Sequence, residues 1–95
     1  MKISEFEAFV AANAKMGLDR LTYSIIVLCG EAGEVAEWYK KRHYRGNEEY
    51  TDDMLKSELG DVLHYVSRIA QHQGWTLKDC MSDNIAKLTA RNKAK

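Results

Sequence analysis

The sequence predicts an all-α protein: one domain over residues 1–95, built like a four-helix bundle and assembled as a dimer or tetramer. Three observations support this prediction. Apolar residues recur every three or four positions along most of the chain, which is the period of an α-helix. The 95 residues include no proline, and the expected connections are short, as in helical bundles. A domain of this size buries only about 60–65% of its unfolded surface, so association is a natural source of stability.

The first helix is expected over Ile3–Met16. Ser4 and Glu7 have the S-x-x-E spacing of a capping box, in which each side chain bonds the backbone N–H of the other residue. Gly17 is expected to stop the helix, because glycine adopts the left-handed conformation of a C-terminal cap. The apolar stripe of this helix is Ile3, Phe6, Phe9 and Val10.

The second helix is expected over Leu21–Tyr44, with Asp19 as its start signal. The segment Ile25–Cys29 is apolar all round, which predicts burial on more than one side and therefore a partner subunit. Cys29 is expected to be buried because it lies in this apolar run, and to be a free thiol because neither cysteine has C-x-x-C spacing. The stripe of this helix is Leu21, Ile25, Leu28, Ala32, Val35 and Tyr39.

Two further helices follow a loop at Gly46–Asn47. The third is expected from about Thr51 to Gln73, where Gly74 ends it. Thr76 and Asp79 form a second pair with capping spacing, and they predict the start of a fourth helix. The residues of the fourth helix expected to face inward are Leu77, Cys80, Met81, Ile85 and Leu88.

The charge balance and hydropathy exclude several classes of protein. Fourteen basic residues balance fourteen acidic ones, so no net field draws the protein to nucleic acid or to an anionic membrane. The longest apolar run is too short to span a bilayer, and the N-terminus lacks the apolar core of a signal peptide. Together with unpaired cysteines, these features lead us to expect a cytoplasmic protein.

Four acids form two pairs with i, i+3 spacing: Glu31 with Glu34, and Glu58 with Asp61. Residues at this spacing share one face of a helix. Two such faces turned toward each other gather four carboxylates in one volume. At an effective dielectric of about 20, two like charges roughly 4 Å apart repel by about 4 kcal/mol. The pattern therefore predicts a bound cation.

The alternative for these acids is an ordinary solvated helix face. Against it, Gly30, Gly33 and Gly60 adjoin the pairs, and each glycine inside a helix costs roughly 0.5–1 kcal/mol. Close helix approach, or space for a ligand, would offset that cost. Oxygen ligands without imidazole favour Mg²⁺ or Mn²⁺. A di-iron bundle would need Glu-x-x-His twice, and only Asp61-x-x-His64 approximates it.

Three ordered segments resemble one family. The segments 30–37 (GEAGEVAE) and 58–63 (ELGDVL) resemble the E-x-x-E…E-x-x-D signature of MazG-like, all-α nucleoside triphosphate pyrophosphohydrolases. The segment 84–91 (NIAKLTAR) resembles the downstream N-x-x-K-x-x-x-R element of that family. The similarity extends from about Leu21 to Arg91.

This resemblance implies Mg²⁺-dependent hydrolysis of ribo- or deoxyribonucleoside triphosphates to the monophosphate and pyrophosphate, in nucleotide-pool cleansing or regulation. It implies that the metal ligands and catalytic groups are Glu31, Glu34, Glu58 and Asp61. Glu31 or Glu34 is the candidate general base. The implied substrate-binding residues are Asn84, Lys87 and Arg91, whose alternative role is to complement a helix C-terminus. Dimers or tetramers are the implied assemblies.

Other residues have weaker functional interpretations. Glu37 is expected to be solvated or an outer neighbour of the metal site. The basic run 40–45 is expected to be a cationic helix end, the alternatives being a nucleic-acid patch or a contact to substrate phosphates. Trp38, Trp75 and Tyr23 are candidates for a base pocket, although packing is the usual role of tryptophan. The rival function is a non-catalytic oligomerisation or regulatory module that holds a structural cation.

Overall fold

The computed structural model describes residues 1–14 and 20–94. These residues form helices with no strand, which confirms the predicted all-α class. A short π-helical turn, η1, directly continues the second α-helix. The elements are α1 (Ile3–Asn13), α2 (Arg20–Tyr39), η1 (Lys40–Tyr44), α3 (Asp52–His72) and α4 (Leu77–Lys93).

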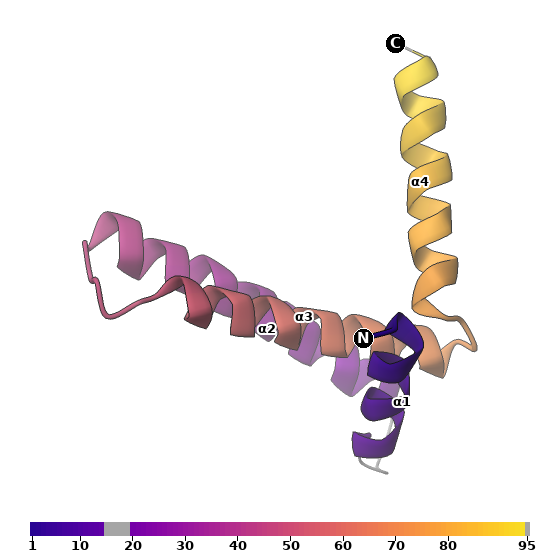
Figure 1. Cartoon of the computed structure of the whole chain (residues 1–95), viewed down its shortest axis with the longest axis horizontal. Coiled ribbons are helices and arrows are strands. Elements are labelled where there is room, and N and C mark those ends of the chain that lie inside the picture. Colours follow the sequence, from indigo (N-terminus) through magenta and orange to yellow (C-terminus); the bar gives the residue numbers. More distant parts are fainter. Residues whose placement is uncertain (15–19, 95) are drawn as a thin grey trace.

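The centre of the fold is an antiparallel hairpin of α2 and α3, which lie side by side along their length (Figure 1). α1 packs beside the C-terminal half of α3. α4 leaves that same end of α3 and points away from the hairpin. Buried side chains are correspondingly few in the described ranges, and they lie where elements meet: Val10, Ser24, Trp38, Ser67, Ala70 and Leu77.

The tip of the hairpin is fixed by a tryptophan. The Trp38 indole Nε1 donates to the Thr51 carbonyl oxygen at 2.8 Å, which links the end of α2 to the start of α3. Thr51 in turn caps α3, because its hydroxyl accepts from the Met54 backbone N–H at 3.3 Å. The predicted start of the third helix and the packing role of Trp38 are therefore confirmed. The π-helical form of the last turn, 40–44, has no signal in the sequence pattern.

The predicted capping box of the first helix is wrong. α1 begins at Ile3, so Ser4 lies inside the helix, and the N-cap residue Lys2 makes no side-chain capping bond. The helix ends at Asn13, earlier than expected. The predicted end at Met16, the stop at Gly17 and the start signal at Asp19 lie outside the described residues.

Glu7 instead caps a different helix. Its carboxylate Oε2 accepts from the backbone N–H of Leu77 at 2.9 Å, and its carbonyl oxygen accepts from Gln71 Nε2 at 2.9 Å. Thr76 and Asp79 form the predicted capping box at the same helix start. α4 therefore begins with several of its free N–H groups satisfied, one of them by a side chain from α1.

Removing this contact should destabilise the fold. We expect Glu7→Ala to lower the free energy of unfolding by about 1–2 kcal/mol, because a partly buried N–H loses a charged acceptor at a helix N-terminus. Urea denaturation at one fixed protein concentration measures the change. Glu48→Ala, which removes an exposed loop acid, is the matched control. Equal midpoints for the two variants would contradict the capping role.

The fourth helix does not pack as predicted. Leu77 is buried, but Met81, Ile85 and Leu88 are exposed, because α4 turns away from the other helices after its first turn. The radius of gyration is 16.0 Å, whereas a compact chain of this length has about 12 Å. One chain therefore does not close the four-helix bundle that the sequence predicted.

One chain by itself does not cover the segment Ile25–Cys29, and its burial against a partner subunit stays a prediction. Cys29, Ile25 and Ile26 are exposed, because they point away from α3. A Cβ added at Gly30, Gly33 or Gly60 would meet nothing within 4 Å, so close helix approach within this chain does not explain these glycines. Among the described residues, none of the helices combines the length and apolar character needed to cross a membrane.

Candidate metal centre

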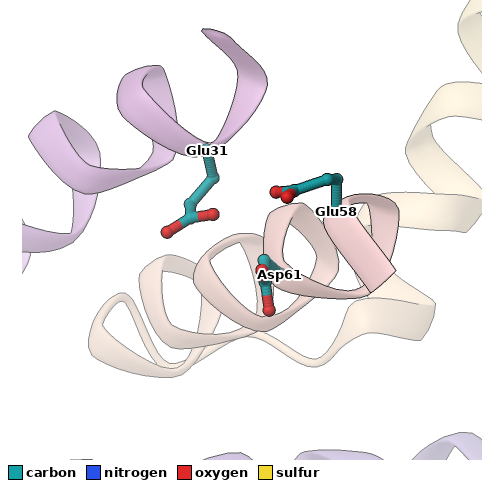
Figure 2. Close-up of side chains that lie close together, drawn as sticks. All are labelled: Glu31, Glu58 and Asp61. Atoms are coloured by element: carbon teal, nitrogen blue, oxygen red, sulfur yellow. The ribbon is translucent and has the colours of Figure 1, made fainter. Parts of the chain in front are cut away.

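Three of the predicted acids converge where α2 crosses the first half of α3. Glu31 extends from α2 toward α3, and Glu58 and Asp61 lie one turn apart on α3 (Figure 2). One carboxylate oxygen from each of the three lies within 4.8 Å of the others. We call Glu31, Glu58 and Asp61 the acid cluster. The antiparallel hairpin creates it, since residues 27 positions apart in the sequence meet only when α3 folds back on α2.

The acid cluster is electrostatically strained without a cation. The pKa of Glu31 is raised above its usual value, first by partial burial and then by the charges of Asp61, Glu58 and Glu34. Both causes disfavour the ionised carboxylate. A proton or a metal ion is therefore held more tightly here than by an isolated surface glutamate.

The other acids of this region lie outside the cluster. Glu34 is exposed and is not among the three converging residues, although its charge contributes to the raised pKa of Glu31. Glu37 is partly exposed and is ion-paired with Lys41 of η1 at 3.4 Å. Its role here is to pair with a cation of the next turn.

The donor set suits a hard divalent cation. The cluster offers only carboxylate oxygens, the ligands that Mg²⁺ and Mn²⁺ prefer, and its partly open position leaves room for water or phosphate oxygens. His64 is not among the three residues. Its ring packs edge-on against Phe9 with centroids 6.4 Å apart, and burial lowers its pKa. The two Glu-x-x-His motifs of a di-iron bundle are not present.

Sequence reasoning missed a tyrosine and an arginine that share a face of α3 with Asp61. Tyr65 and Arg68 follow Asp61 by four and seven residues, which places all three on one face of the helix. Burial raises the pKa of Tyr65, the charge of Arg68 opposes this rise, and the interaction with Tyr23 of α2, which includes a hydrogen bond, adds to it. The Arg68 guanidinium lies 5.1 Å from the Tyr65 ring centroid and donates to the Asn13 carbonyl at 2.8 Å. Helical spacing from Asp61 was the signal that could have found both.

The predicted substrate-binding residues are not brought to the acids within one chain. Asn84, Lys87 and Arg91 lie on α4, and all three are exposed. Figure 1 shows α4 pointing away from the α2–α3 hairpin that carries the acid cluster. In the described ranges, neither Lys87 nor Arg91 forms an ion pair.

The aromatic and basic candidates lie at the two ends of the hairpin. Trp38 and the basic run 40–45 form its tip, where Lys41 is bonded to Tyr50 and Glu37, and these bonds raise its pKa. The run ends the helix as predicted. Trp75 is exposed in the α3–α4 connection. Of the base-pocket candidates, Tyr23 alone is linked to a neighbour of the acid cluster, through its hydrogen bond with Tyr65.

Metal binding at the acid cluster should depend on pH. Because folding raises the pKa of Glu31, the folded state binds that proton more tightly than the unfolded state. The stabilisation that this proton gives to the folded state is complete at pH values below the ordinary glutamate pKa. It is lost as the pH rises through the raised pKa of Glu31. Metal-free protein should therefore lose stability over that range, and Mg²⁺ should restore it.

Thermal melting with and without Mg²⁺ at pH 5 and pH 7.5 measures this effect. Mg²⁺ at one hundred times its Kd would stabilise the fold by about 2.7 kcal/mol at the higher pH, and by less at pH 5, where protons compete. Potassium chloride at matched ionic strength is the control. An equal increase in Tm at both pH values would contradict binding at Glu31.

The chain is similar in sequence to known proteins over most of its length. A family model described as the MazG nucleotide pyrophosphohydrolase domain matches residues 21–95. The chain is similar to the Gene 37 protein of Mycobacterium phage L5, with 38% identity in an alignment of 78 residues that covers 78% of this chain and 68% of that protein. No solved structure gave a significant match.

Proposed function

The chain belongs to the MazG nucleotide pyrophosphohydrolase family, and on that basis we propose that it hydrolyses nucleoside triphosphates to the monophosphate and pyrophosphate with Mg²⁺. The observation that supports this proposal is the convergence of Glu31, Glu58 and Asp61 into an all-oxygen cluster. Substrates are ribo- or deoxyribonucleotides, and the proposed role is cleansing or regulation of a nucleotide pool in the cytoplasm.

The proposed chemistry adds one water molecule across the α–β phosphoanhydride. The water oxygen bonds to phosphorus, the bridging P–O bond breaks, and the water proton is taken up by a carboxylate. Mg²⁺ or Mn²⁺ held by the acid cluster supplies charge neutralisation at the phosphate oxygens and a lowered pKa for bound water. The cluster residues Glu31, Glu58 and Asp61 are the proposed ligands.

Glu34 is the proposed general base. It lies one turn beyond Glu31 on the same face of α2, yet it is exposed and stands apart from the cluster. In this proposal its carboxylate would take up the proton of the attacking water, while Glu31, Glu58 and Asp61 would hold the metal. In the same proposal Asn84, Lys87 and Arg91 bind the phosphate chain and sugar, since charged donors suit phosphate oxygens.

We also propose that the active form is an oligomer, with a dimer as its unit. Ile25 lies half a turn away from Glu34 on α2, and Leu63 lies roughly half a turn away from Asp61 on α3. The hairpin therefore has an acid side and an apolar side, and the apolar side is about half exposed in one chain. A second copy packed against that side would complete a four-helix core. The residues of the apolar side are Ile25, Cys29, Ala32, Ala36, Leu59 and Leu63.

The function is tested by incubating the protein with Mg²⁺ and each common NTP and dNTP, and by measuring pyrophosphate and monophosphate. We expect wild type to release both in equal amounts, and Glu58→Ala to lose at least about 100-fold, since even residues that only support metal ligands contribute 10–100-fold. Glu48→Ala should match wild type. If wild type and Glu58→Ala are equally inactive on all nucleotides, the non-catalytic module becomes the better interpretation.

A further inference from the structure

The contacts that hold the fourth helix to the rest of the chain lie at its beginning. Leu77, in the first turn of α4, is buried, whereas every residue from 81 to 94 is exposed. Figure 1 shows the start of α4 where α1 and the end of α3 meet, and the remainder of the helix extends away from them. The direction of α4 within one chain is therefore set at its N-terminal end.

A small change in that direction would move the far residues of α4 a long way. Each helical residue adds 1.5 Å, so Lys87 lies about 15 Å and Arg91 about 21 Å beyond Leu77. A tilt of about 10° at the start of the helix would displace these two residues by about 2.6 Å and 3.6 Å. A hydrogen bond of about 3 Å to a phosphate oxygen is lost over such a displacement. The placement of Lys87 and Arg91 thus depends on what fixes the first turn.

The connection from α3 leaves one hinge before α4. Gly74 turns the chain with φ of +79°, a conformation that suits glycine, and the Trp75 N–H donates to the Ala70 carbonyl at 2.8 Å. Thr76 follows in an extended conformation, with φ of −94° and ψ of 163°, and α4 begins at Leu77. The dihedral angles of Thr76 therefore decide the direction in which α4 leaves the junction.

Two kinds of side-chain contact act at this hinge. The Thr76 N–H donates to Asp79 Oδ2 at 2.9 Å, and the Asp79 N–H donates to the Thr76 hydroxyl at 3.1 Å. This capping box stabilises the start of α4 but joins it to no other element. The Glu7 carboxylate, in contrast, belongs to α1 and accepts from the Leu77 backbone N–H at 2.9 Å. Burial of Leu77 is non-directional, whereas this hydrogen bond weakens steeply when its angle changes.

Glu7 is itself held in place, because α1 is attached to α3 at two points. The Glu7 carbonyl accepts from Gln71 Nε2 at 2.9 Å, and the Asn13 carbonyl at the other end of α1 accepts from Arg68 at 2.8 Å. Val10, between these two bonds, is fully buried. α1 and α3 therefore form a rigid base from which the Glu7 side chain reaches the first turn of α4.

We propose that Glu7 is a positioning residue for the substrate-binding helix: by holding the Leu77 N–H, it sets the direction of α4 and hence the places of Lys87 and Arg91. Glu7 touches no reacting group in this proposal and acts through α4. The inference rests on the proposed function for what Lys87 and Arg91 bind, but the direction of α4 can be measured without it.

Substitutions of Glu7 separate the reach of its side chain from its charge. Glu7→Gln keeps an acceptor oxygen at the same reach, whereas Glu7→Asp keeps the charge on a side chain that is shorter by one methylene. We expect KM for nucleoside triphosphates to rise about tenfold in Glu7→Ala and Glu7→Asp, the effect of losing a hydrogen bond to a charged group. The value of kcat should change less, since uniform binding is lost. Glu7→Gln should retain the wild-type KM.

Asp79→Ala is the matched control for helix stability. It removes a capping bond at the same helix start, so urea denaturation should show a loss of stability comparable to that of Glu7→Ala. Its KM should stay at the wild-type value, because the contact between α1 and α4 is intact. Equal increases in KM for Asp79→Ala and Glu7→Ala would overturn the proposal, since helix stability alone would then explain both.

Distances between two nitroxide spin labels measure the direction of α4 without any activity. The labels are attached to Lys56→Cys on α3 and Ala90→Cys on α4, two exposed positions, in a chain whose native cysteines are replaced by alanine. Dilution with unlabelled chains restricts the measurement to pairs within one chain. We expect the distance distribution to shift or broaden by about 3 Å in Glu7→Ala, the displacement that a tilt of about 10° gives at Ala90. Glu7→Gln and Asp79→Ala should leave it unchanged.

The outcomes distinguish this proposal from the proposed function. An unchanged distance distribution in Glu7→Ala would overturn the positioning role, and so would an active Glu7→Ala with the wild-type KM; both results would leave the function intact. A wild type that is inactive on every nucleotide would overturn the function. A shifted distance in Glu7→Ala would then still support the role of Glu7 in directing α4.

Discussion

Glu31→Gln is expected to abolish magnesium-dependent hydrolysis while making the metal-free protein more stable. Glu31 is the residue that α2 contributes to the acid cluster. Its replacement by glutamine exchanges one of the three converging carboxylates for a neutral amide. The loss of activity should be about 100-fold or more, the upper range for groups that support a metal ligand. In a nucleotide assay the rate should not recover at high Mg²⁺ if Glu31 positions the ion as well as binding it.

The opposite change in stability follows from the pKa of Glu31. Partial burial and the charges of Asp61, Glu58 and Glu34 all disfavour its ionised form. A neutral amide of the same shape removes this repulsion, so the Tm measured in a chelator at pH 7.5 should rise. The rise should be smaller at pH 5, where the wild-type carboxyl holds its proton for more of the time.

Glu34→Gln is the matched control for this variant. Glu34 is exposed and lies outside the cluster, so its replacement should lower activity without a comparable gain in metal-free stability. If both variants were stabilised equally, the repulsion between carboxylates would not be concentrated at Glu31 but shared by Glu34 as well. A destabilised Glu31→Gln would contradict the electrostatic account.

Leu63→Asp is expected to break the oligomer and, with it, most of the fold's stability. Leu63 is 53% exposed in one chain and lies on the apolar side of the hairpin. In the proposed dimer it would be covered by the second copy, where burying a leucine contributes about 1.5–3 kcal/mol. An aspartate there loses this contribution and places an unpaired charge in the interface. Because both chains of the proposed dimer carry the substitution, each interface contains two aspartates.

Sedimentation at micromolar concentration and thermal melting measure this effect together. We expect the wild type to sediment as a dimer or larger species with a Tm that rises with concentration. Leu63→Asp should sediment as a monomer and melt lower or be largely unfolded. Tyr44→Asp, at an 82% exposed tyrosine on the hairpin tip, should leave both measurements unchanged. A monomeric wild type would contradict the proposed interface.

Helical periodicity was sufficient to predict much of the fold. The all-α class, the caps at Thr51 and Thr76 and the turn at Gly74 follow from local interactions among residues a few positions apart. The predicted cap at Ser4 was wrong because the N-cap is Lys2, two residues earlier, and because the Glu7 carboxylate accepts from the backbone N–H of the distant residue Leu77. Local spacing could not anticipate a bond between α1 and α4.

The candidate site, like the fold, could be predicted only in part from local spacing. The two i, i+3 acid pairs could be recognised from the sequence, since such pairs share a helix face wherever the helix lies. That Glu31 rather than Glu34 meets Glu58 and Asp61 depends on the rotation of α2 against α3, which packing sets. Helical spacing on α3 by itself places Tyr65 on the same face as Asp61, whereas the interaction of Tyr65 with Tyr23 of α2 depends on that packing.

The sequence alone determined the helices, the family signature and the chemical type of the site, because these depend on residue type and short-range spacing. The tertiary structure decided how the parts are distributed. It placed three acids together across the hairpin, left an apolar side exposed and directed α4 away from the acids. These arrangements depend on contacts between segments that are distant in the sequence. For that reason, the sequence could not predict that one chain leaves the four-helix bundle incomplete, or that Lys87 and Arg91 lie away from the acid cluster.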